Sequence, residues 1–241
     1  MASISEKAQL MPASAIRKLV PFADAAKKQG VKVYHLNLGQ PDIKSPACAL
    51  DAVRNFSQEN VSYSHSAGLM ELRKGLVEKY YKKIGIDLTV DELIVTVAGS
   101  ESVNLALEIA CNPGDEVIVL EPFYTNYNTF AFMNGLTLKA IPTDIRNGFQ
   151  IPPIEEFEKA ITEKTKAILV CNPGNPTGTQ YSKESMLALG EIARRHDLFL
   201  LSDEVYREFC YTDEPHFSAM NIPGLEQNVI LIDSVSKRYN L

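Results

Sequence analysis

Short apolar runs alternate with longer amphipathic segments over most of the chain beyond residue 92. Strands buried on both faces are apolar along their whole length, whereas a surface helix repeats its apolar positions with a period of about 3.6 residues. Most of the runs are continuously apolar. The alternation therefore predicts an α/β fold, with a mainly parallel sheet sandwiched by helices. The runs expected to form strands are residues 93–97, 117–120, 137–141, 167–171, 198–201 and 229–233.

Helical periodicity marks the segments between these runs. Ser100 is a favourable N-terminal cap for one helix, which a Pro-Gly pair stops. Residues 183–196 place small apolar side chains in one stripe, and residues 68–84 set leucines against a lysine-rich outer face. The first forty residues lie outside this alternation. They predict a helix near residues 13–29, then a strand and turn in VYHLNLGQPD, residues 33–42.

Composition and charge narrow the class of protein. The 241 residues are 45% hydrophobic and 22% charged, which is ordinary for a globular protein with a large core. The net charge is −6 and no basic cluster could follow a phosphate backbone, so we expect no nucleic-acid partner. The polar N-terminus lacks an apolar signal core, and no apolar run approaches about 18 residues. We therefore expect a cytoplasmic protein with no membrane partner.

Cysteine and histidine spacing favours neither a disulfide framework nor a metal site. The four cysteines are widely spaced without a CxxC pair, and the four histidines are equally scattered. We expect reduced, mostly buried thiols and no metal.

Chemistry in an open α/β sheet is expected beyond the carboxyl ends of its strands, where ligands bind. Five of the predicted strands are followed by polar segments. Together these supply a helix start, an aromatic ring, an amide, a carboxylate with a phenol, and a lysine. The segments are AGSE at 98–101, EPFY at 121–124, NPGNPTG at 172–178, SDEVY at 202–206 and SVSK at 234–237.

Pyridoxal phosphate is a cofactor that uses this whole set. It needs a lysine for its aldehyde, a carboxylate for its ring nitrogen, donors to its phenolate oxygen, a ring to stack on and a seat for its phosphate. Through NPGNPTG, SDEVY and SVSK in this order, the sequence closely resembles the class I/II aminotransferases, which are fold-type I pyridoxal phosphate enzymes. The resemblance covers essentially the whole chain. It implies an N-terminal arm and small-domain segment over residues 1–40, and a cofactor-binding large domain over residues 41–241.

The resemblance assigns catalysis to three side chains. Lys237 is then the Schiff-base lysine, which also moves the proton at the substrate Cα. Asp203 pairs with the ring nitrogen, and Tyr206 donates to the phenolate oxygen. Taken singly, these residues would be read as a solvated lysine, a turn-capping aspartate and a core tyrosine. The motif SxSK after a buried strand favours the catalytic interpretation.

Two further residues match cofactor contacts of the family. Asn175 resembles the asparagine that donates to the phenolate oxygen and reaches toward the substrate carboxylate. Its ordinary alternative is local hydrogen bonding in a Pro/Gly-rich turn. Tyr124 matches the ring-stacking position, although neighbouring aromatic residues could be core.

The phosphate seat is expected at a helix start, where backbone amides point outward. By the resemblance, Gly99 and Ser100 contribute amides and a hydroxyl, and Glu101 contributes only its amide because its carboxylate would repel a phosphate. Ser234 and, less strongly, Ser236 are further candidates. A simple serine cap or capping box is an alternative that is compatible with this role.

Two residues in the first third of the chain match positions of the family's site, and one of them implies a site shared between two subunits. Tyr63 resembles the tyrosine that reaches the phosphate of the neighbouring subunit's cofactor, which implies a homodimer. Gly39 resembles the glycine whose backbone lies against the substrate carboxylate. By themselves they would be a surface tyrosine and a strand-ending turn glycine.

The chain ends at Leu241, whereas members of the family are substantially longer. By the resemblance, the remainder supplies the arginines for the phosphate and the substrate carboxylate, part of the large domain and most of the small domain. Arg238 cannot be assumed to replace them. We therefore expect an N-terminal portion with uncovered apolar surface and strand edges, hence poor solubility or chaperone dependence. Its activity in isolation stays open.

The leading interpretation is an aminotransferase that acts on an L-amino acid, aspartate-like, aromatic or broad, and a 2-oxo acid. A carbon–sulfur β-lyase or a cyclopropane-forming synthase would use the same cofactor seat. An alternative of another class is a truncated, catalytically silent binding module. A dinucleotide oxidoreductase is disfavoured because no strand is followed by GxGxxG.

Overall fold

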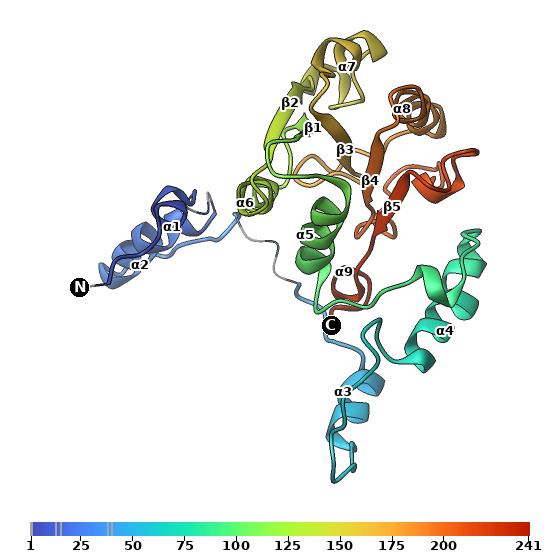
Figure 1. The fold of residues 1–241 in the computed structure, drawn as a ribbon. Coiled ribbons are helices and arrows are strands. Elements are labelled where there is room, and N and C mark those ends of the chain that lie inside the picture. The colour runs from blue at the N-terminus through green and yellow to red at the C-terminus, as the bar shows by residue number, and fades with distance from the viewer. Residues whose placement is uncertain (1, 13, 15, 38, 40) are drawn as a thin grey trace.

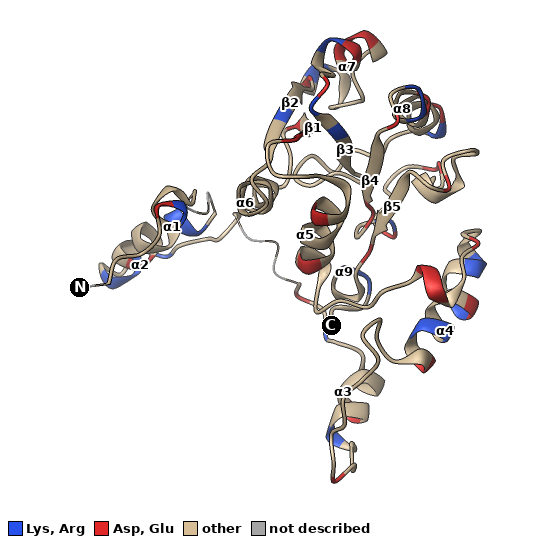
Figure 2. Cartoon of the chain, in the orientation of Figure 1, with Lys and Arg blue, Asp and Glu red and all other residues tan. Residues whose placement is uncertain are grey.

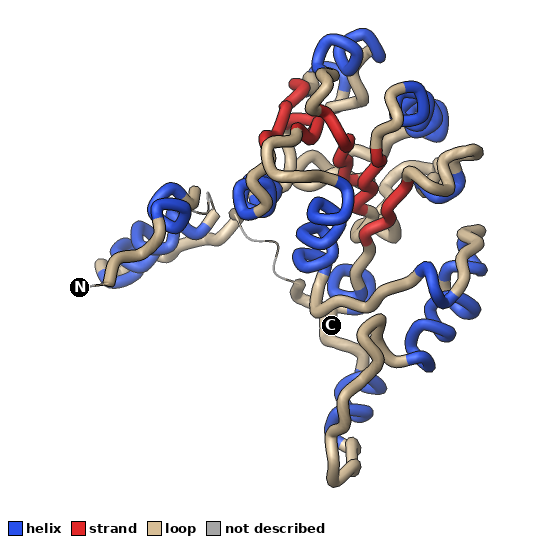
Figure 3. The backbone as a smooth tube through the Cα atoms, viewed as in Figure 1, coloured by secondary structure: helices blue, strands red, loops and turns tan. Residues whose placement is uncertain are grey.

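The sheet is parallel throughout. The computed structural model describes residues 2–12, 14, 16–37, 39 and 41–241, and within these residues five strands pair in the order β2-β1-β3-β4-β5 (Figure 1). All four pairings are parallel, which confirms the predicted α/β class (Figure 3). The strands are β1 (Glu116–Glu121), β2 (Thr137–Pro142), β3 (Thr165–Cys171), β4 (Phe199–Asp203) and β5 (Val229–Ile232).

The strand predicted at residues 93–97 is wrong. The segment pairs with no strand among the described residues, and the Val95 amide donates instead to the Ala67 carbonyl at 3.0 Å. Ile94 and Val97 are 62% and 93% exposed. An apolar run shows that a segment is able to pair, but not that a strand with a free edge lies beside it. The stretch 33–42 also contains no strand in its described part, which excludes residues 38 and 40.

The three best-marked helices form where they are expected, as α4 (Met70–Lys79), α5 (Gly99–Ala110) and α8 (Lys183–Arg195). The cap predicted at Ser100 is wrong, because the N-cap of α5 is Ala98, two residues earlier. The Glu101 carboxylate accepts from the Val97 amide at 2.6 Å, just ahead of the helix. The expected N-terminal helix is a 3-10 turn (Arg17–Leu19) followed by α2; residues 13 and 15 lie outside the described part. The other helices are α1 (Glu6–Leu10), α2 (Val20–Lys28), α3 (Ala47–Arg54), α6 (Asn126–Met133), α7 (Ile154–Ala160) and α9 (Val235–Tyr239).

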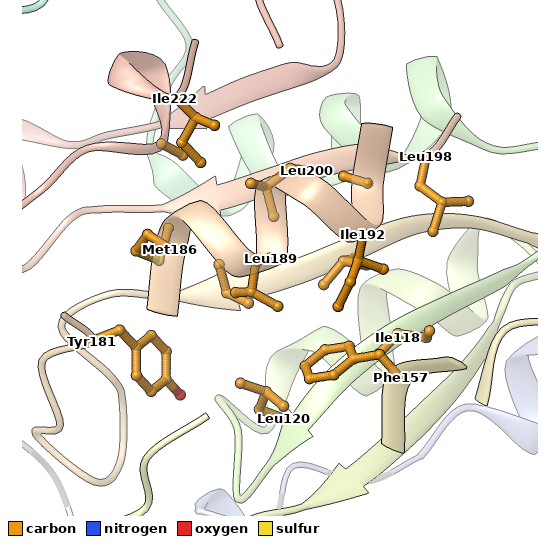
Figure 4. Close-up of a cluster of buried hydrophobic side chains, with 14 of the residues drawn as sticks. Ile118, Leu120, Phe157, Tyr181, Met186, Leu189, Ile192, Leu198, Leu200 and Ile222 are labelled. Atoms are coloured by element: carbon orange, nitrogen blue, oxygen red, sulfur yellow. The ribbon is translucent and has the colours of Figure 1, made fainter. Parts of the chain in front are cut away.

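Two hydrophobic cores lie on opposite faces of the sheet. Neighbouring strand residues point to opposite faces, so Ile118 packs under α7 and α8 whereas Val117 and Val119 pack under α5 and α6. Figure 4 shows the first core, in which Phe157 and Ile192 meet the sheet. Each fully buried aliphatic or phenyl side chain stabilises the fold by about 1.5–3 kcal/mol. Helices on both faces therefore explain why the central strands β1, β3 and β4 are mainly apolar and buried. In the edge strand β2 only Ile141 is buried.

The segments that carry α1, α2 and α3 extend away from this sandwich. In Figure 1, α1 and α2 project from one side and α3 from another. Their large apolar side chains stay exposed, as at Phe22 and Leu36. Figure 2 shows both signs of charge on α4, α7 and α8. No helix in the described ranges has the length and apolarity needed to cross a membrane.

We expect Gly190→Ala to destabilise the protein although alanine favours helices. A Cβ at this position of α8 would lie 2.6 Å from Ile222 Cγ2 and 2.8 Å from Leu225 Cδ1, both in the buried core. Such overpacking costs about 1–3 kcal/mol. Urea unfolding measures it, with Gly75→Ala in α4 as the control, because a Cβ there meets no atom within 4 Å. A Gly190→Ala midpoint at or above that of Gly75→Ala would contradict this packing.

Candidate functional site

The site lies where the strands reach their carboxyl ends. Beyond the regular ladders, the Asn172 amide donates to the Asp203 carbonyl at 2.9 Å, and the Glu204 amide donates to the Ile232 carbonyl at 2.8 Å. These bonds continue the pairing of β3, β4 and β5 by one residue. The segments that carry the predicted chemistry therefore start from fixed positions at one edge.

Asp203 is the last residue of β4 and is only 6% exposed. Its Oδ2 accepts from the Tyr127 hydroxyl at 2.7 Å, and its Oδ1 accepts from the Val205 amide at 3.4 Å. Burial raises the pKa of Asp203, while the Tyr127 hydrogen bond and the Lys237 charge favour its anion. Among the described residues no ion pair involves Asp203, so its charge is balanced mainly by a neutral donor.

Lys237 extends from α9 toward Tyr206. The turn into α9 is held by the Ser234 hydroxyl, which accepts from the Ser236 amide at 3.1 Å. From this turn Lys237 Nζ reaches 5.8 Å from the centroid of the Tyr206 ring. A short helix directly after β5 therefore presents an exposed amine at the same edge as Asp203.

Tyr206 and Asn175 meet at this edge from different loops. The Asn175 side-chain amide donates to the Tyr206 hydroxyl at 3.4 Å, and burial raises the pKa of Tyr206. Both residues line a cavity of about 300 Å³, together with Phe209. The NPGNPTG segment is also a turn with its own hydrogen bonds, since the Gly174 amide donates to the Thr179 carbonyl at 2.8 Å. Turn geometry and a polar side chain at the site thus coexist.

The start of α5 lies beside the turn into α9. A Cβ built on Gly99 would be 3.7 Å from Ser234 Cβ, so the first turn of α5 and the Ser234 side chain are neighbours. The first amides of a helix have no intrahelical acceptor, which leaves those of Gly99 and Ser100 facing outward. The Glu101 amide already donates to the Ala98 carbonyl at 3.0 Å. Gly99, Ser100 and Ser234 therefore form the stronger anion seat.

Tyr124 connects to the site through Tyr127. Its ring packs edge-on against Tyr127, with centroids 5.5 Å apart, and its hydroxyl accepts from the Asn126 side chain at 2.7 Å. Tyr63 and Gly39 are not brought to this edge. Tyr63 is fully exposed in the segment between α3 and α4, and Gly39 is exposed in the segment before α3.

Sequence reasoning missed a charged cluster behind the site. Asp233 accepts from the Tyr81 hydroxyl at 2.9 Å, and its carboxylate is bridged by Arg238 Nη2 at 2.9 and 2.8 Å. Arg238 also donates to Glu208 at 2.9 Å and lies 3.8 Å over the Tyr80 ring. The side chain of Arg238 is therefore committed to holding α9. Partners separated by up to 152 residues give no local sequence signal.

The second part of the cluster is a buried pair next to Asp203. Arg207 Nη2 lies 3.1 Å from Glu204 Oε2 and 3.8 Å from Asp233 Oδ2. Glu204 Oε1 accepts from three donors of the neighbouring segments, which include the Ala219 amide at 2.9 Å. Burial raises the pKa of Glu204 to about 7, with Arg207 opposing this shift. Burial, and then repulsion from Arg207, lowers the pKa of His216 to about 4.

The donor set fits pyridoxal phosphate. An amine, a buried carboxylate free of arginine, a phenol paired with an amide, and a helix start beside a serine all face one edge, at Lys237, Asp203, Tyr206 with Asn175, and Gly99 with Ser234. They are the kinds of group that the aldehyde, ring nitrogen, phenolate and phosphate of this cofactor would require.

Comparison with known proteins shows which family the chain resembles. The family model described as aminotransferase class I and II matches residues 31–241. The chain is 36% identical over 238 residues to the putative aminotransferase YugH of Bacillus subtilis, covering 98% of this chain and 60% of that protein. It is 37% identical over 219 residues to the aspartate/prephenate aminotransferase of Thermus thermophilus, covering 90% and 56%.

Solved structures give the same result. The aspartate aminotransferase of Thermotoga maritima superposes with a TM-score of 0.91 at 31% identity, over 99% of this chain and 63% of that one. The Thermus thermophilus aspartate aminotransferase with maleate has a TM-score of 0.89 at 34% identity, over 99% and 62%. The chain therefore spans about three fifths of the length of these relatives.

We expect Glu204 and His216 to contribute opposite pH dependences to stability. The folded protein keeps a proton on Glu204 that the unfolded chain releases near pH 4.5, so this stabilisation is lost as the pH rises from about 4.5 to 7. The lowered pKa of His216 acts in the other direction, and its contribution grows as the pH rises from about 4 to 6.5. Removing the carboxyl with Glu204→Gln should make the free energy of unfolding rise more steeply with pH between about 4.5 and 6.5.

Urea titrations at several pH values measure this slope. His216→Asn is the matched control, and it should change the slope in the opposite sense because only the Glu204 contribution remains. Parallel stability curves for the unsubstituted chain and Glu204→Gln would show that Glu204 titrates normally.

Proposed function

Because the chain belongs to the class I and II aminotransferase family, we propose that it binds pyridoxal phosphate and supplies the catalytic lysine for amino-group transfer between an L-amino acid and a 2-oxo acid. The observation that carries the proposal is the environment of Asp203. Its neighbours Glu204 and Asp233 are compensated by arginines, but Asp203 is buried without an ion-pair partner in the described chain. A carboxylate of this kind is suited to pair with a cationic ring nitrogen.

Different residues at the carboxyl edge of the sheet would bind different parts of the cofactor. Asp203 would hold a proton on the ring nitrogen, and Tyr206 with Asn175 would donate to the phenolate oxygen. The amides of Gly99 and Ser100 and the Ser234 hydroxyl would bind the phosphate, and Tyr124 would cover the ring. Residues 41–241 would then be the cofactor-binding large domain, with residues 1–40 as an N-terminal arm and small-domain segment.

Lys237 would perform the proton transfer. When bound, pyridoxal phosphate supplies an electron-withdrawing ring that acidifies the substrate Cα–H bond. Nζ of Lys237 lies near the Tyr206 ring. It would take the proton from the substrate Cα and return it to C4′ of the cofactor. A general base placed in this way contributes about 10²–10⁴-fold to the rate.

The proposed substrate class is based on the names of the relatives. The named relatives include aspartate and aspartate/prephenate aminotransferases, so we propose an L-amino acid that is aspartate-like, aromatic or drawn from a broad range, with a 2-oxo acid acceptor. Gly39 and Asn175 would lie toward the substrate carboxylate.

A homodimer is part of the proposal. Tyr63 is fully exposed on a segment that projects from the sandwich, which suits a side chain that reaches the phosphate seat of a second copy. The exposed apolar residues of the same segment, such as Val61, would become covered in that assembly.

We expect reduction of the chain with borohydride in the presence of pyridoxal phosphate to label Lys237 selectively, as read by peptide mass. Lys237→Ala should abolish the label and lower transamination by at least about 10²-fold. Lys166→Ala is the matched control, because this exposed lysine lies at the amino end of β3, away from the site. Equal labelling of Lys166 and Lys237, or full activity of Lys237→Ala, would overturn the proposal.

A further inference from the structure

Tyr127 contacts two groups that are expected to touch the cofactor ring, Asp203 at its nitrogen and Tyr124 on its face. It lies in α6, is 1% exposed, and donates from its hydroxyl to Asp203 Oδ2 at 2.7 Å. Its ring also packs edge-on against Tyr124 at 5.5 Å. One side chain therefore touches both the carboxylate at the end of β4 and the aromatic residue that follows β1.

We propose that Tyr127 is a positioning residue of this site. It keeps the Asp203 carboxylate in its anionic form and in one orientation, and it sets the plane of the Tyr124 ring. The inference rests on the proposed function only in giving Asp203 the ring nitrogen as its partner. No motif quoted for the family contains Tyr127, and its sequence context identifies it only as a candidate core aromatic.

The surroundings of Tyr127 hold its ring in one orientation. Phe123 stacks on it with centroids 6.3 Å apart and planes 14° apart, and Tyr124 packs nearly perpendicular at 88°. Val117, Val119 and Leu169 belong to the same buried cluster. A tyrosine enclosed in this way loses no further rotamer freedom when its hydroxyl binds Asp203.

The hydroxyl is a donor at any working pH. Burial, and then the negative charge of Asp203, hold the pKa of Tyr127 well above its usual value of 10.0. The phenol therefore keeps its proton and adds no charge of its own. A neutral donor favours the anion of Asp203 without neutralising it, whereas an arginine would form a closed ion pair.

The other groups that face Asp203 cannot replace this bond. Asp233, at the end of β5, opposes the anion, and Lys237 of α9 favours it. The Cys171 thiol at the end of β3 is kept neutral because burial raises its pKa. Within the described part of its own segment, the Asp203 side chain accepts a hydrogen bond only from the Val205 amide, at the longer distance of 3.4 Å. The Tyr127 hydroxyl is therefore the short hydrogen bond that opposes the effect of burial.

The test is Tyr127→Phe, which removes one oxygen and keeps the ring. We expect the pKa of Asp203 to rise by about one to two units in the chain without cofactor, measured by carboxyl ¹³C NMR, since a hydrogen bond to a charged group is lost. Tyr181→Phe is the control: it removes a buried hydroxyl in the core on the opposite face and should leave that pKa unchanged. With pyridoxal phosphate, only Tyr127→Phe should weaken binding, by about tenfold.

A double-mutant cycle separates positioning from a general loss of stability. Tyr127→Phe should lower the urea midpoint more in the unsubstituted chain than in Asp203→Asn, because the bond to the anion exists only in the former. An unchanged Asp203 pKa in Tyr127→Phe, or an equal shift in Tyr181→Phe, would overturn the inference. The proposed function fails separately, if Lys237 of the unsubstituted chain is not labelled, because the NMR comparison uses no cofactor.

Discussion

Three carboxylates, Asp203, Glu204 and Asp233, lose most of their water at one edge of the sheet, and the site depends on how each negative charge is compensated. Glu204 faces Arg207 and three hydrogen-bond donors. Asp233 is bridged by Arg238 and bound by Tyr81. Removing one partner of such a buried pair leaves an uncompensated charge, which is far costlier than losing an exposed one.

This compensation explains how the lysine helix is held. α9 is only five residues long, which is too short to be stable by itself. Asp233 at its entrance and Arg238 within it form a charged hydrogen-bond clamp, and the Tyr80 ring covers the guanidinium. The segment that follows α4 is thereby tied to the carboxyl end of β5. The position of Lys237 thus depends on residues far away in the sequence.

Asp203 differs from its two neighbours because its short hydrogen bond comes from a neutral phenol. A phenol lowers the cost of burying the anion but leaves most of its charge available to a further cation. The fold achieves this by packing α6 on the face of the sheet that also carries α5. Tyr127 of this helix contacts both Tyr124, in the segment just before it, and Asp203, so the stacking candidate and the carboxylate share one support.

The local pattern was sufficient for the regular part of the fold. Short, mostly apolar runs identified β1 to β5, because strands covered on both faces are apolar at most positions. The pattern failed at residues 93–97, where an apolar run has no strand beside it in the described chain. It also failed at Ser100, because the helix is capped two residues earlier, at Ala98. In both places the outcome depends on neighbours in space, which periodicity does not report.

The features of the candidate site also fall into two groups, those that the sequence identified and those that only the structure decided. The sequence by itself determined which chemical groups follow each strand, since SDEVY, NPGNPTG and SVSK are contiguous motifs and parallel strands bring their carboxyl ends to one edge. Only the tertiary structure decided which buried charges are paired. Tyr127 and Asp203 are 76 residues apart, and Tyr81 and Asp233 are 152 apart. The physical reason is that desolvation and hydrogen bonding act over a few ångströms in space, whatever the separation along the chain.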